Sequence, residues 1–488
     1  MTNFFTETKT NEVIELSSTS SEVENLSLER ALLWKLDYHI LPLLYLAYII
    51  TFIDRANIGN VKIEGMLTDL DMKGNDYNIA LIVYAVPFIL LELPSSLALR
   101  RYRPGNYIAF IMFGWGVATL GAGITRSYAG LLVCRFLVGC FEAGLIPSCT
   151  FLMNQYYKKF EFQRRYSFFF TSSHIGGAFS GLLTYALVKM NNIGGYAGWR
   201  WVFIIEGLFT ILLAITSFFL IVPLPEDVTF LTPSEKTLLL KRLEGDHLTA
   251  TSEDKTPLTL SQIIKIMTHW KIVLPLLACF ACNIATSATT AFQPTVLKNL
   301  GFTSSSAQIH TIPVYMSGLF FCLLFGFASD LTRIRYPYVL FGSAITLVGW
   351  TLELAAVKHI DVSTGLGWPH QRYAGIFLLL IGFSIELPIL IVWAGSNLKG
   401  RKERVVGFAT LIGGSQLGNL VSANVFIAKQ EKCGFKTGMA TGVGVGCLGV
   451  LAVSVFFGGL WWENGGLEKR ESDGGDGTGD ERGFRNVF

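Results

Sequence analysis

The sequence Cys134–Pro147, CRFLVGCFEAGLIP, places two charged residues inside an apolar segment that runs from about Tyr128 to Met153. An α-helix needs roughly 20 residues to cross the hydrocarbon core of a bilayer, so this segment is long enough to span one. Arg135 and Glu142 are seven residues apart, which puts both side chains on one helical face, about 10 Å apart along the axis. Ionisable groups at membrane depth are costly unless they are paired or hydrated. The pair therefore indicates either a functional site or a structural ion pair between helices.

A second charged pair favours the functional interpretation. Asp54 and Arg55 interrupt another apolar segment, which runs from Ile40 to Asn60. Two spans of one chain that each hold an acid and an arginine favour a shared functional site over a structural ion pair.

The composition excludes a soluble fold. Hydrophobic residues make up 51% of the 488 residues and charged residues only 15%, whereas soluble domains carry about a quarter charged residues. Apolar runs of spanning length recur from Ile40 to Trp462, which is too many for one soluble core. The eight cysteines fall mostly inside these runs, so no disulfide framework is expected, and a net charge of +3 does not indicate nucleic-acid binding.

The apolar runs predict an all-α membrane protein with about twelve transmembrane helices, six on each side of a polar segment. This arrangement is typical of a duplicated transporter whose site lies between the two halves. The expected spans are Ile40–Asn60, Tyr77–Leu99, Asn106–Thr125, Tyr128–Met153, Arg165–Met190, Trp199–Val222, Lys271–Leu297, Gln308–Asp330, Pro337–Val357, Tyr373–Asn397, Val405–Ala428 and Thr437–Trp462.

Basic residues in the short loops predict the orientation. The loops after the second, fourth, eighth and tenth spans are rich in Lys and Arg, and the loops on the other side are poorer. We therefore expect both termini and the polar middle segment to be cytosolic. The expected parts are a cytosolic N-terminal tail (1–39), an N-terminal six-helix bundle (40–222), a cytosolic linker (223–270), a C-terminal six-helix bundle (271–462) and a cytosolic C-terminal tail (463–488).

The linker contains one clear helix start. Thr232–Glu235, TPSE, has the pattern of a capping box with proline at the first helical position. The sequence that follows predicts a short amphipathic helix on the cytosolic face. A regulatory segment and a plain connector between the bundles both remain open.

Two corresponding loops predict a cytosolic gate. Residues 326–333, GFASDLTR, close the second span of the second half, and residues 94–101, PSSLALRR, close the second span of the first half. Acidic and basic side chains in such loops can bond helix ends and hold one conformation. Asp330, Arg333 and Arg100 are therefore the gating candidates, and the first copy lacks the acid.

The motifs distributed along the chain resemble the major facilitator superfamily. More narrowly, they are similar to the fungal anion:cation symporters of the allantoate permease type. The resemblance implies two six-helix bundles, a monomer in the plasma membrane, and proton-coupled uptake of a small organic anion such as a vitamin or metabolite carboxylate. It rests on Ile53–Asn60 (IDRANIGN), Arg135–Gly139 with Glu142, Gly198–Phe203 with Glu206 and Gly207, Phe292–Pro294, Leu300–Thr303, Pro313–Tyr315, and Trp393 with Asn397.

Related anion symporters carry an Asp-Arg pair in the first span and an Arg and a Glu seven residues apart in the fourth. The resemblance implies that Asp54 and Glu142 carry protons. It also implies that the arginines meet the substrate or hold the acids. Because a guanidinium binds a carboxylate through two parallel hydrogen bonds, we expect Arg55 to anchor the anion and Arg135 to hold Glu142. Asn57, three residues past Asp54, is expected to add a hydrogen bond.

Other polar residues in spans are weaker candidates for the substrate site. His174 is either a cavity residue or a buried histidine bonded to a backbone carbonyl. Trp393 and Asn397 lie near the cytosolic end of the tenth span, where they can close the cavity from the C-terminal half. Further acids at or near span depth are Glu92, Glu206, Glu353 and Glu386, and for Glu206 a structural and a functional role are equally open.

The favoured hypothesis is secondary active import driven by the proton gradient, with no other cofactor and no metal. Export of a metabolite or drug by the same fold is an alternative, and a nutrient sensor that does not transport is another. An enzyme is the least favoured class, because the sequence shows no nucleophile with its base and no metal-ligand spacing. The sequence shows no phosphate loop, which argues against transport driven by ATP. The expected partners are the anion, protons and the lipid bilayer.

Overall fold

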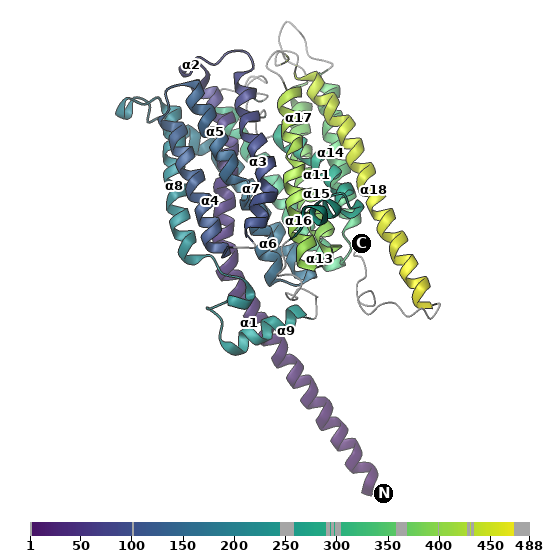
Figure 1. Cartoon of the computed structure of the whole chain (residues 1–488). Helices are drawn as coiled ribbons and strands as arrows, with labels where there is room; N and C mark the ends of the chain where they lie inside the picture. Colours follow the sequence, from purple (N-terminus) through teal and green to yellow (C-terminus); the bar gives the residue numbers. More distant parts are fainter. Residues whose placement is uncertain are drawn as a thin grey trace.

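The computed structural model is a long helical bundle (Figure 1). It describes residues 2–99, 102–244, 258–288, 304–357, 368–398, 400–426 and 434–472, together with Gln293, Leu297 and Gln430. The described residues form helices and turns and no strand, as the sequence predicts.

The N-terminal half contains six long helical units. They are α1 (Thr2–Val61), which continues through a π-helix (Lys62–Met66) into α2 (Leu67–Asp69), then α3 (Asp76–Leu99), α4 (Pro104–Ile124), α5 (Tyr128–Glu142) with α6 (Leu145–Tyr156), α7 (Lys159–Val188) and α8 (Gly198–Leu220). A 3₁₀ turn at Ile193–Gly195 precedes α8.

The second half repeats this pattern after a polar linker. The linker contains a 3₁₀ turn (Pro225–Asp227), α9 (Pro233–Glu244) and α10 (Leu260–Met267). The C-terminal half consists of α11 (Trp270–Ser287), α13 (Ser304–Thr332), α14 (Tyr336–Val357), α15 (Pro369–Ser396), α16 (Gly400–Ser415) with α17 (Leu417–Val425), and α18 (Lys436–Ser472).

Eleven helical stretches of the described residues are long and apolar enough to cross a membrane. The predicted fifth span, α7, is not among them, because its Ser, Thr and His residues lower its mean hydropathy. It packs against α1 in its own half and α13 in the other half, and Thr171, Ser172 and Ser173 are buried there. A helix in this central position needs fewer apolar residues, since protein covers most of its surface.

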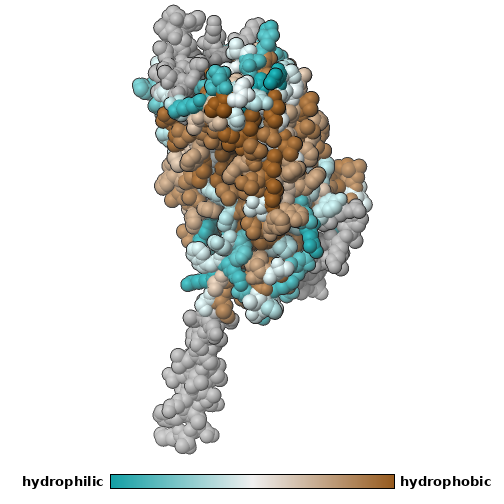
Figure 2. Space-filling model, turned by 90° about the vertical axis from the view of Figure 1, so that its left-hand side faces the viewer, coloured by the Kyte–Doolittle hydropathy of each residue, from teal (hydrophilic) through white to brown (hydrophobic). Residues whose placement is uncertain are grey.

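The two ends of the molecule differ. The N-terminal end of α1 and helix α9 lie at one end, here called the tail side, and α2 lies at the other, here called the loop side (Figure 1). Between them, the surface carries a broad hydrophobic band bordered by hydrophilic residues (Figure 2). This band has the form expected of a surface in contact with lipid.

The seam between the two halves is closed on the tail side. Leu99 of α3 and Phe151 of α6 pack there against Val405 of α16. Nearby, the backbone N–H of Arg164 donates to Asp330 at 2.8 Å. On the loop side the Asn78 amide donates to the carbonyl oxygen of Ala423 at 2.7 Å.

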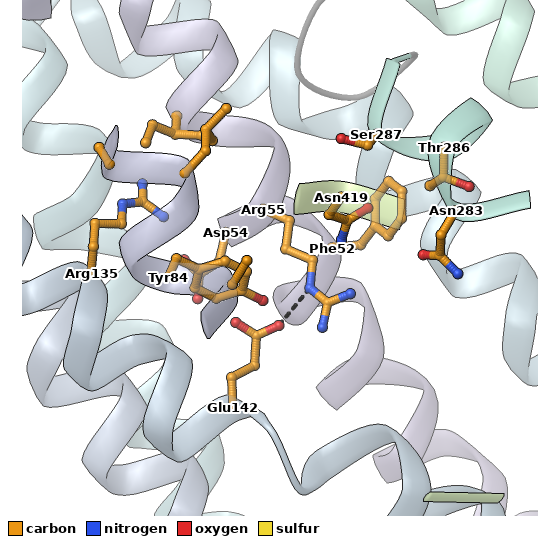
Figure 3. A pocket seen from close by; sticks show the side chains of 14 residues that line it. Phe52, Asp54, Arg55, Tyr84, Arg135, Glu142, Asn283, Thr286, Ser287 and Asn419 are labelled. Atoms are coloured by element: carbon orange, nitrogen blue, oxygen red, sulfur yellow. Dashed lines mark hydrogen bonds and ion pairs between the residues drawn. The ribbon is translucent and has the colours of Figure 1, made fainter. Parts of the chain in front are cut away.

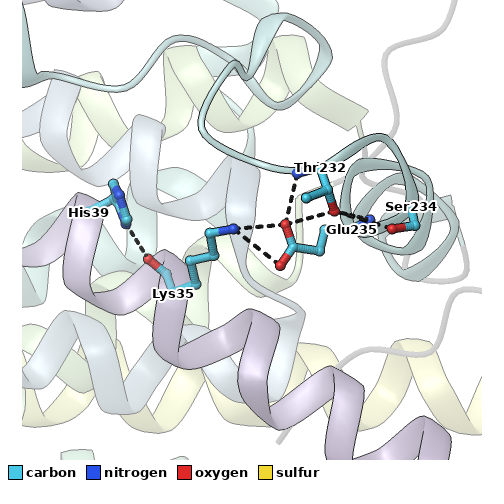
Figure 4. Close-up of polar contacts among 5 residues, drawn as sticks. All are labelled: Lys35, His39, Thr232, Ser234 and Glu235. Carbon is cyan, nitrogen blue, oxygen red and sulfur yellow. Dashed lines mark hydrogen bonds and ion pairs between the residues drawn. The ribbon is translucent and has the colours of Figure 1, made fainter.

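The predicted capping box begins α9 and joins it to α1 (Figure 4). The Thr232 N–H donates to Glu235 at 2.8 Å, and the Glu235 N–H donates to the Thr232 hydroxyl at 3.3 Å. Lys35 of α1 donates to the same carboxylate at 2.8 Å. This hydrogen bond holds the pKa of Glu235 below its usual range. The contact is therefore retained until the pH falls through that lowered value.

A buried arginine makes the second contact of α9 with the bundle. Arg242 donates to Glu161 of α7 at 2.6 Å and lies 3.7 Å from Glu29 of α1. Because its side chain is only 3% exposed, its loss leaves two carboxylates close together without their cation.

Arg242→Gln is expected to lower the free energy of unfolding by about 1–3 kcal/mol, the usual cost of leaving a charged hydrogen-bonding group without its partner. Thermal unfolding of the purified protein measures the change. The exposed neighbour Lys241 provides the matched control, since Lys241→Gln is expected to leave the unfolding temperature unchanged. Equal effects of the two substitutions would contradict a specific role of Arg242 in docking α9.

Candidate functional site

A pocket between the halves brings together charged residues from two spans of the N-terminal half. Asp54 and Arg55 reach it from α1, and Arg135 and Glu142 from α5. In Figure 3, Arg55 and Glu142 meet in the centre and Arg135 lies apart at the left. The four residues that the sequence singles out therefore share one site.

Arg55 and Glu142 form the central ion pair. Arg55 Nε donates to Glu142 Oε1 at 2.6 Å, and the side chains are 18% and 0% exposed, respectively. The guanidinium also lies over the Phe88 ring, 4.9 Å from its centroid. Among the described residues, Arg55 Nη2 has no hydrogen-bond partner. The arginine therefore keeps donor capacity for a ligand in the pocket.

Asp54 and Arg135 belong to a second buried cluster. Asp54 attracts the Arg135 guanidinium, although neither Asp54 oxygen has a hydrogen-bond partner among the described residues, and the guanidinium lies 5.3 Å from the centre of the Phe203 ring. Asp54 also lies beside Glu206 of α8. The amide of Asn57, a candidate for substrate binding, donates to Glu206, and Asn57 is not among the residues that line the pocket.

The expectation that Arg135 holds Glu142 is wrong, because Arg55 is the partner of Glu142. Side chains on an α-helix tilt toward its N-terminus. Arg135 precedes Glu142 on α5 and therefore leans away from it, as Figure 3 shows. α1 crosses at the level of Glu142 and supplies the nearer cation.

Two glycines and a helix break fix the position of Glu142. This residue ends α5, and α6 begins three residues later at Leu145. A Cβ atom on Gly139 would overlap the carbonyl oxygen of Tyr84 in α3, and one on Gly144 would overlap the Ser95 hydroxyl. The absence of side chains here lets α3 approach closely and places Tyr84 in the pocket beside Glu142.

The C-terminal half contributes uncharged polar groups that the sequence analysis did not identify. Asn283, Thr286 and Ser287 of α11 and Asn419 of α17 line the pocket opposite Arg55 and Glu142 (Figure 3). The three α11 residues have the i, i+3, i+4 spacing of one helical face. A polar stripe with this spacing in an otherwise apolar span is the signal that predicts them.

Three further substrate-site candidates lie away from this pocket. His174 is fully buried, and its Nε2 is 2.5 Å from the Ser384 hydroxyl across the seam. Trp393 packs edge-on against Phe456, with ring centroids 4.6 Å apart. The Asn397 amide donates to the Trp393 carbonyl at 2.9 Å. None of the three lines the pocket. In this structure, with the tail-side seam closed, the three side chains are buried between helices.

The structure places the gating candidates Asp330 and Arg333 in different surroundings. Asp330 lies in the tail-side seam, but its arginine is Arg335, at 3.8 Å, and not Arg333, which is exposed. Arg333 has a φ of 57°, so the chain turns there and brings Arg335 back under the helix end. Arg335 also donates to Gln163 of α7 at 2.5 Å. Arg100 lies outside the described residues.

Comparison with known proteins identifies the family. The family model described as Major Facilitator Superfamily matches residues 44–423. The chain belongs to the major facilitator superfamily. An uncharacterized transporter of Schizosaccharomyces pombe is 30% identical over 424 residues, 85% of this chain and 82% of that protein. The MFS transporter prlL of a fungal species is 31% identical over 421 residues, 84% of this chain and 82% of that protein.

Solved structures of the superfamily have the same fold. The proton:xylose symporter XylE aligns with a TM-score of 0.67 at 15% identity, over 86% of this chain and 95% of that chain. A bacterial homologue of the human lysosomal transporter Spinster, inward-facing and unoccupied, aligns with a TM-score of 0.62 at 17% identity, over 86% of this chain and 96% of that chain. The chain is therefore a multi-pass membrane transporter, and the narrower resemblance to anion:cation symporters stays a prediction.

Gly139→Val is expected to lower the free energy of unfolding by about 1–3 kcal/mol, because the added side chain pushes α3 away from α5. Thermal unfolding of the purified transporter measures this. Gly444 of α18 has no atom within 4 Å of an added Cβ, so Gly444→Val is the matched control and is expected to be nearly neutral. A Gly139 variant as stable as the control would contradict close packing at the site.

Proposed function

We propose that this transporter imports a small organic anion together with protons. The observation that carries the proposal is the Arg55–Glu142 pair inside the pocket between the halves. A bound carboxylate and Glu142 compete for the same guanidinium. The two are therefore linked through one side chain, which is the physical basis for coupling an anion to a proton.

The coupling follows from the exchange of partners at Arg55. When the substrate carboxylate binds Arg55, Glu142 loses its cation in a site of low dielectric. A carboxylate without a partner is costly in such a site, and protonation removes that cost. Anion and proton therefore favour each other's binding. Release of the anion returns Arg55 to Glu142 and expels the proton.

The second cluster supports an additional proton site at Asp54. Asp54 and Glu206 lie side by side, and two adjacent carboxyl groups are unfavourable when both are ionised. One proton between them removes the repulsion. Arg135 attracts the ionised form of Asp54. We assign Asp54 a proton-carrying role and Arg135 a positioning role.

The pocket lining supports an anion with neutral polar substituents. Arg55 and Arg135 are the basic residues of the lining, and both belong to the N-terminal half. The C-terminal half presents amides and hydroxyls, which bind hydroxyl, amide or ring-nitrogen groups of a ligand. A small metabolite or vitamin carboxylate has this combination of one charged end and a neutral polar remainder.

Orientation and fold support import into the cytosol. The loops rich in Lys and Arg predict that the tail side is cytosolic, and that side of the seam is closed. The pocket is thereby separated from the cytosol in the described state. XylE, which shares the fold, is a proton:xylose symporter. The proposal places the chain in the plasma membrane as a monomer.

The test is uptake of radiolabelled small carboxylates by yeast that lacks its own anion permeases. Uptake is expected to rise as the external pH falls and to collapse with a protonophore. Arg55→Ala and Glu142→Gln are each expected to reduce uptake at least tenfold, because one removes the anion's partner and the other the coupled acid. Glu386→Gln changes a buried acid outside the pocket and serves as the control. Uptake that is independent of pH and of Glu142 would refute proton coupling, and efflux of a preloaded anion without uptake would indicate an exporter.

The α11 stripe is expected to select among anions. Asn283 lines the pocket, and its N–H groups already donate to the Cys279 carbonyl and the Ser415 hydroxyl, so its side-chain oxygen is the group that it offers to a ligand. Asn283→Ala should therefore weaken transport of anions with polar substituents by about tenfold, the effect of one lost hydrogen bond of roughly 1.4 kcal/mol. Anions with purely apolar substituents should lose far less. Competition assays against the labelled substrate give the ratio. A uniform loss for both classes would contradict contact between Asn283 and the neutral part of the substrate.

A further inference from the structure

Glu92 is a buried acid that the transport mechanism above does not use. It lies on α3 with 1% of its surface exposed, and neither carboxyl oxygen has a hydrogen-bond partner among the described residues. An ionised carboxylate in this position costs many kcal/mol, whereas a neutral carboxyl group costs far less. The surroundings of Glu92 therefore fit its protonated form.

The Glu92 side chain lies in the seam between the two halves. A Cβ atom placed on Gly413 of α16 would be 2.6 Å from Glu92 Oε2 and 3.1 Å from Glu92 Cβ. The carboxyl group thus lies directly against the backbone of α16. Two helical turns further along α3, the apolar contact of Leu99 with Phe151 and Val405 closes the tail side.

The charges near Glu92 belong to the pocket. Arg55 of α1 attracts its ionised form, and Glu142 of α5 repels it. The charged residues of α16, at positions 401–404, are at least nine residues from Gly413, or about 14 Å along the helix. The other titratable groups on helices that pack against α3 are Tyr128, Cys134, Arg135 and Cys140 of α5 and Cys149 and Tyr156 of α6, and α17 has none.

We propose that Glu92 is a proton-binding site that controls opening of the tail-side seam. Neutral Glu92 allows α3 to pack against α16, and ionised Glu92 favours their separation, because water then reaches the carboxylate. The closed seam binds the proton more tightly than the open seam. By linkage, a higher pH on the tail side favours opening and a lower pH favours closure.

This proton is distinct from those at Asp54 and Glu142. It enters and leaves from the tail side as the seam closes and opens, and it is not carried across the membrane. Acidification of the tail-side compartment therefore holds the seam closed and slows the transport cycle. The inference rests on the proposed function only in treating seam opening as a step of that cycle, since the linkage itself needs no substrate.

The experiment measures the seam directly in the full-length protein. Tyr102 and Leu331 lie on the tail side of the N- and C-terminal halves and are 58% and 76% exposed. Spin labels are attached to cysteines introduced at these two positions in a variant without the native cysteines. Pulsed electron–electron double resonance then measures the distance between the labels and so the separation of the halves. The measurement is made from about pH 5 to pH 8 in the parent, in Glu92→Gln, in Glu92→Asp and in Glu386→Gln.

In the parent, the ratio of separated to closed molecules is expected to rise with pH, by up to tenfold per unit for one linked proton. Glu92→Gln should remain closed at every pH, because its amide is always neutral. Glu92→Asp, which keeps a titrating group, and Glu386→Gln, a buried acid away from the seam, should both keep the response. A parent whose seam does not respond to pH, or a Glu92→Gln variant that responds as the parent does, would overturn the proposal.

The same preparations separate this inference from the proposed function. If no carboxylate is taken up but the seam still responds to pH through Glu92, only the proposed function fails. If uptake is proton-coupled but the seam of Glu92→Gln follows the parent, only the role of Glu92 fails.

Discussion

The cost of a charge in a low-dielectric interior constrains every part of this structure. Arg55 is always charged. Inside the pocket, its Nε lies 2.6 Å from Oε1 of Glu142, which is its ion-pair partner. The pair requires α1, α3 and α5 to approach closely, which glycine at positions 139 and 144 permits. Disturbing these backbone contacts would leave a buried guanidinium without its carboxylate. Helix packing and site chemistry therefore depend on the same few residues.

The two halves contribute different chemistry to the pocket. Asp54, Arg55, Arg135 and Glu142 all come from the first half, while the second half provides Asn283, Thr286, Ser287 and Asn419. A ligand that binds Arg55 and the neutral groups together joins the halves. In the proposed mechanism, protonation of Glu142 changes the N-terminal half, and the bound substrate transmits that change across the seam. This asymmetry explains how one bound molecule can sense protonation and close the pocket at the same time.

The sequence predicts the spans and the charged residues of the site well, because both depend on local composition. Asp54, Arg55, Arg135 and Glu142 stand out as charges in apolar segments, and all four line one pocket. Which of them pair depends on how α1 crosses α5, and spacing within one helix carries no information on that. The same limit explains why Arg335 rather than Arg333 contacts Asp330, because a left-handed turn at Arg333 reverses the chain. The neutral polar residues of α11 can be recognised from the sequence only when polar positions, and not apolar ones alone, are tested for helical periodicity.

The formal charge of the pocket supplies a physical reason for the proposed coupling of anion and proton. When the proton shared by Asp54 and Glu206 sits on Glu206, and Asp54, Arg55, Arg135 and Glu142 are ionised, the lining has no net charge, and an entering carboxylate makes it negative. Closing a dry seam around a net charge is far more costly than closing it around a neutral site. One proton on Glu142 restores neutrality when the anion is bound. A proton without the anion leaves the pocket positive, and the anion without a proton leaves it negative. On the proposed mechanism, the pocket closes most readily when both are present or both are absent, which is the condition that symport requires.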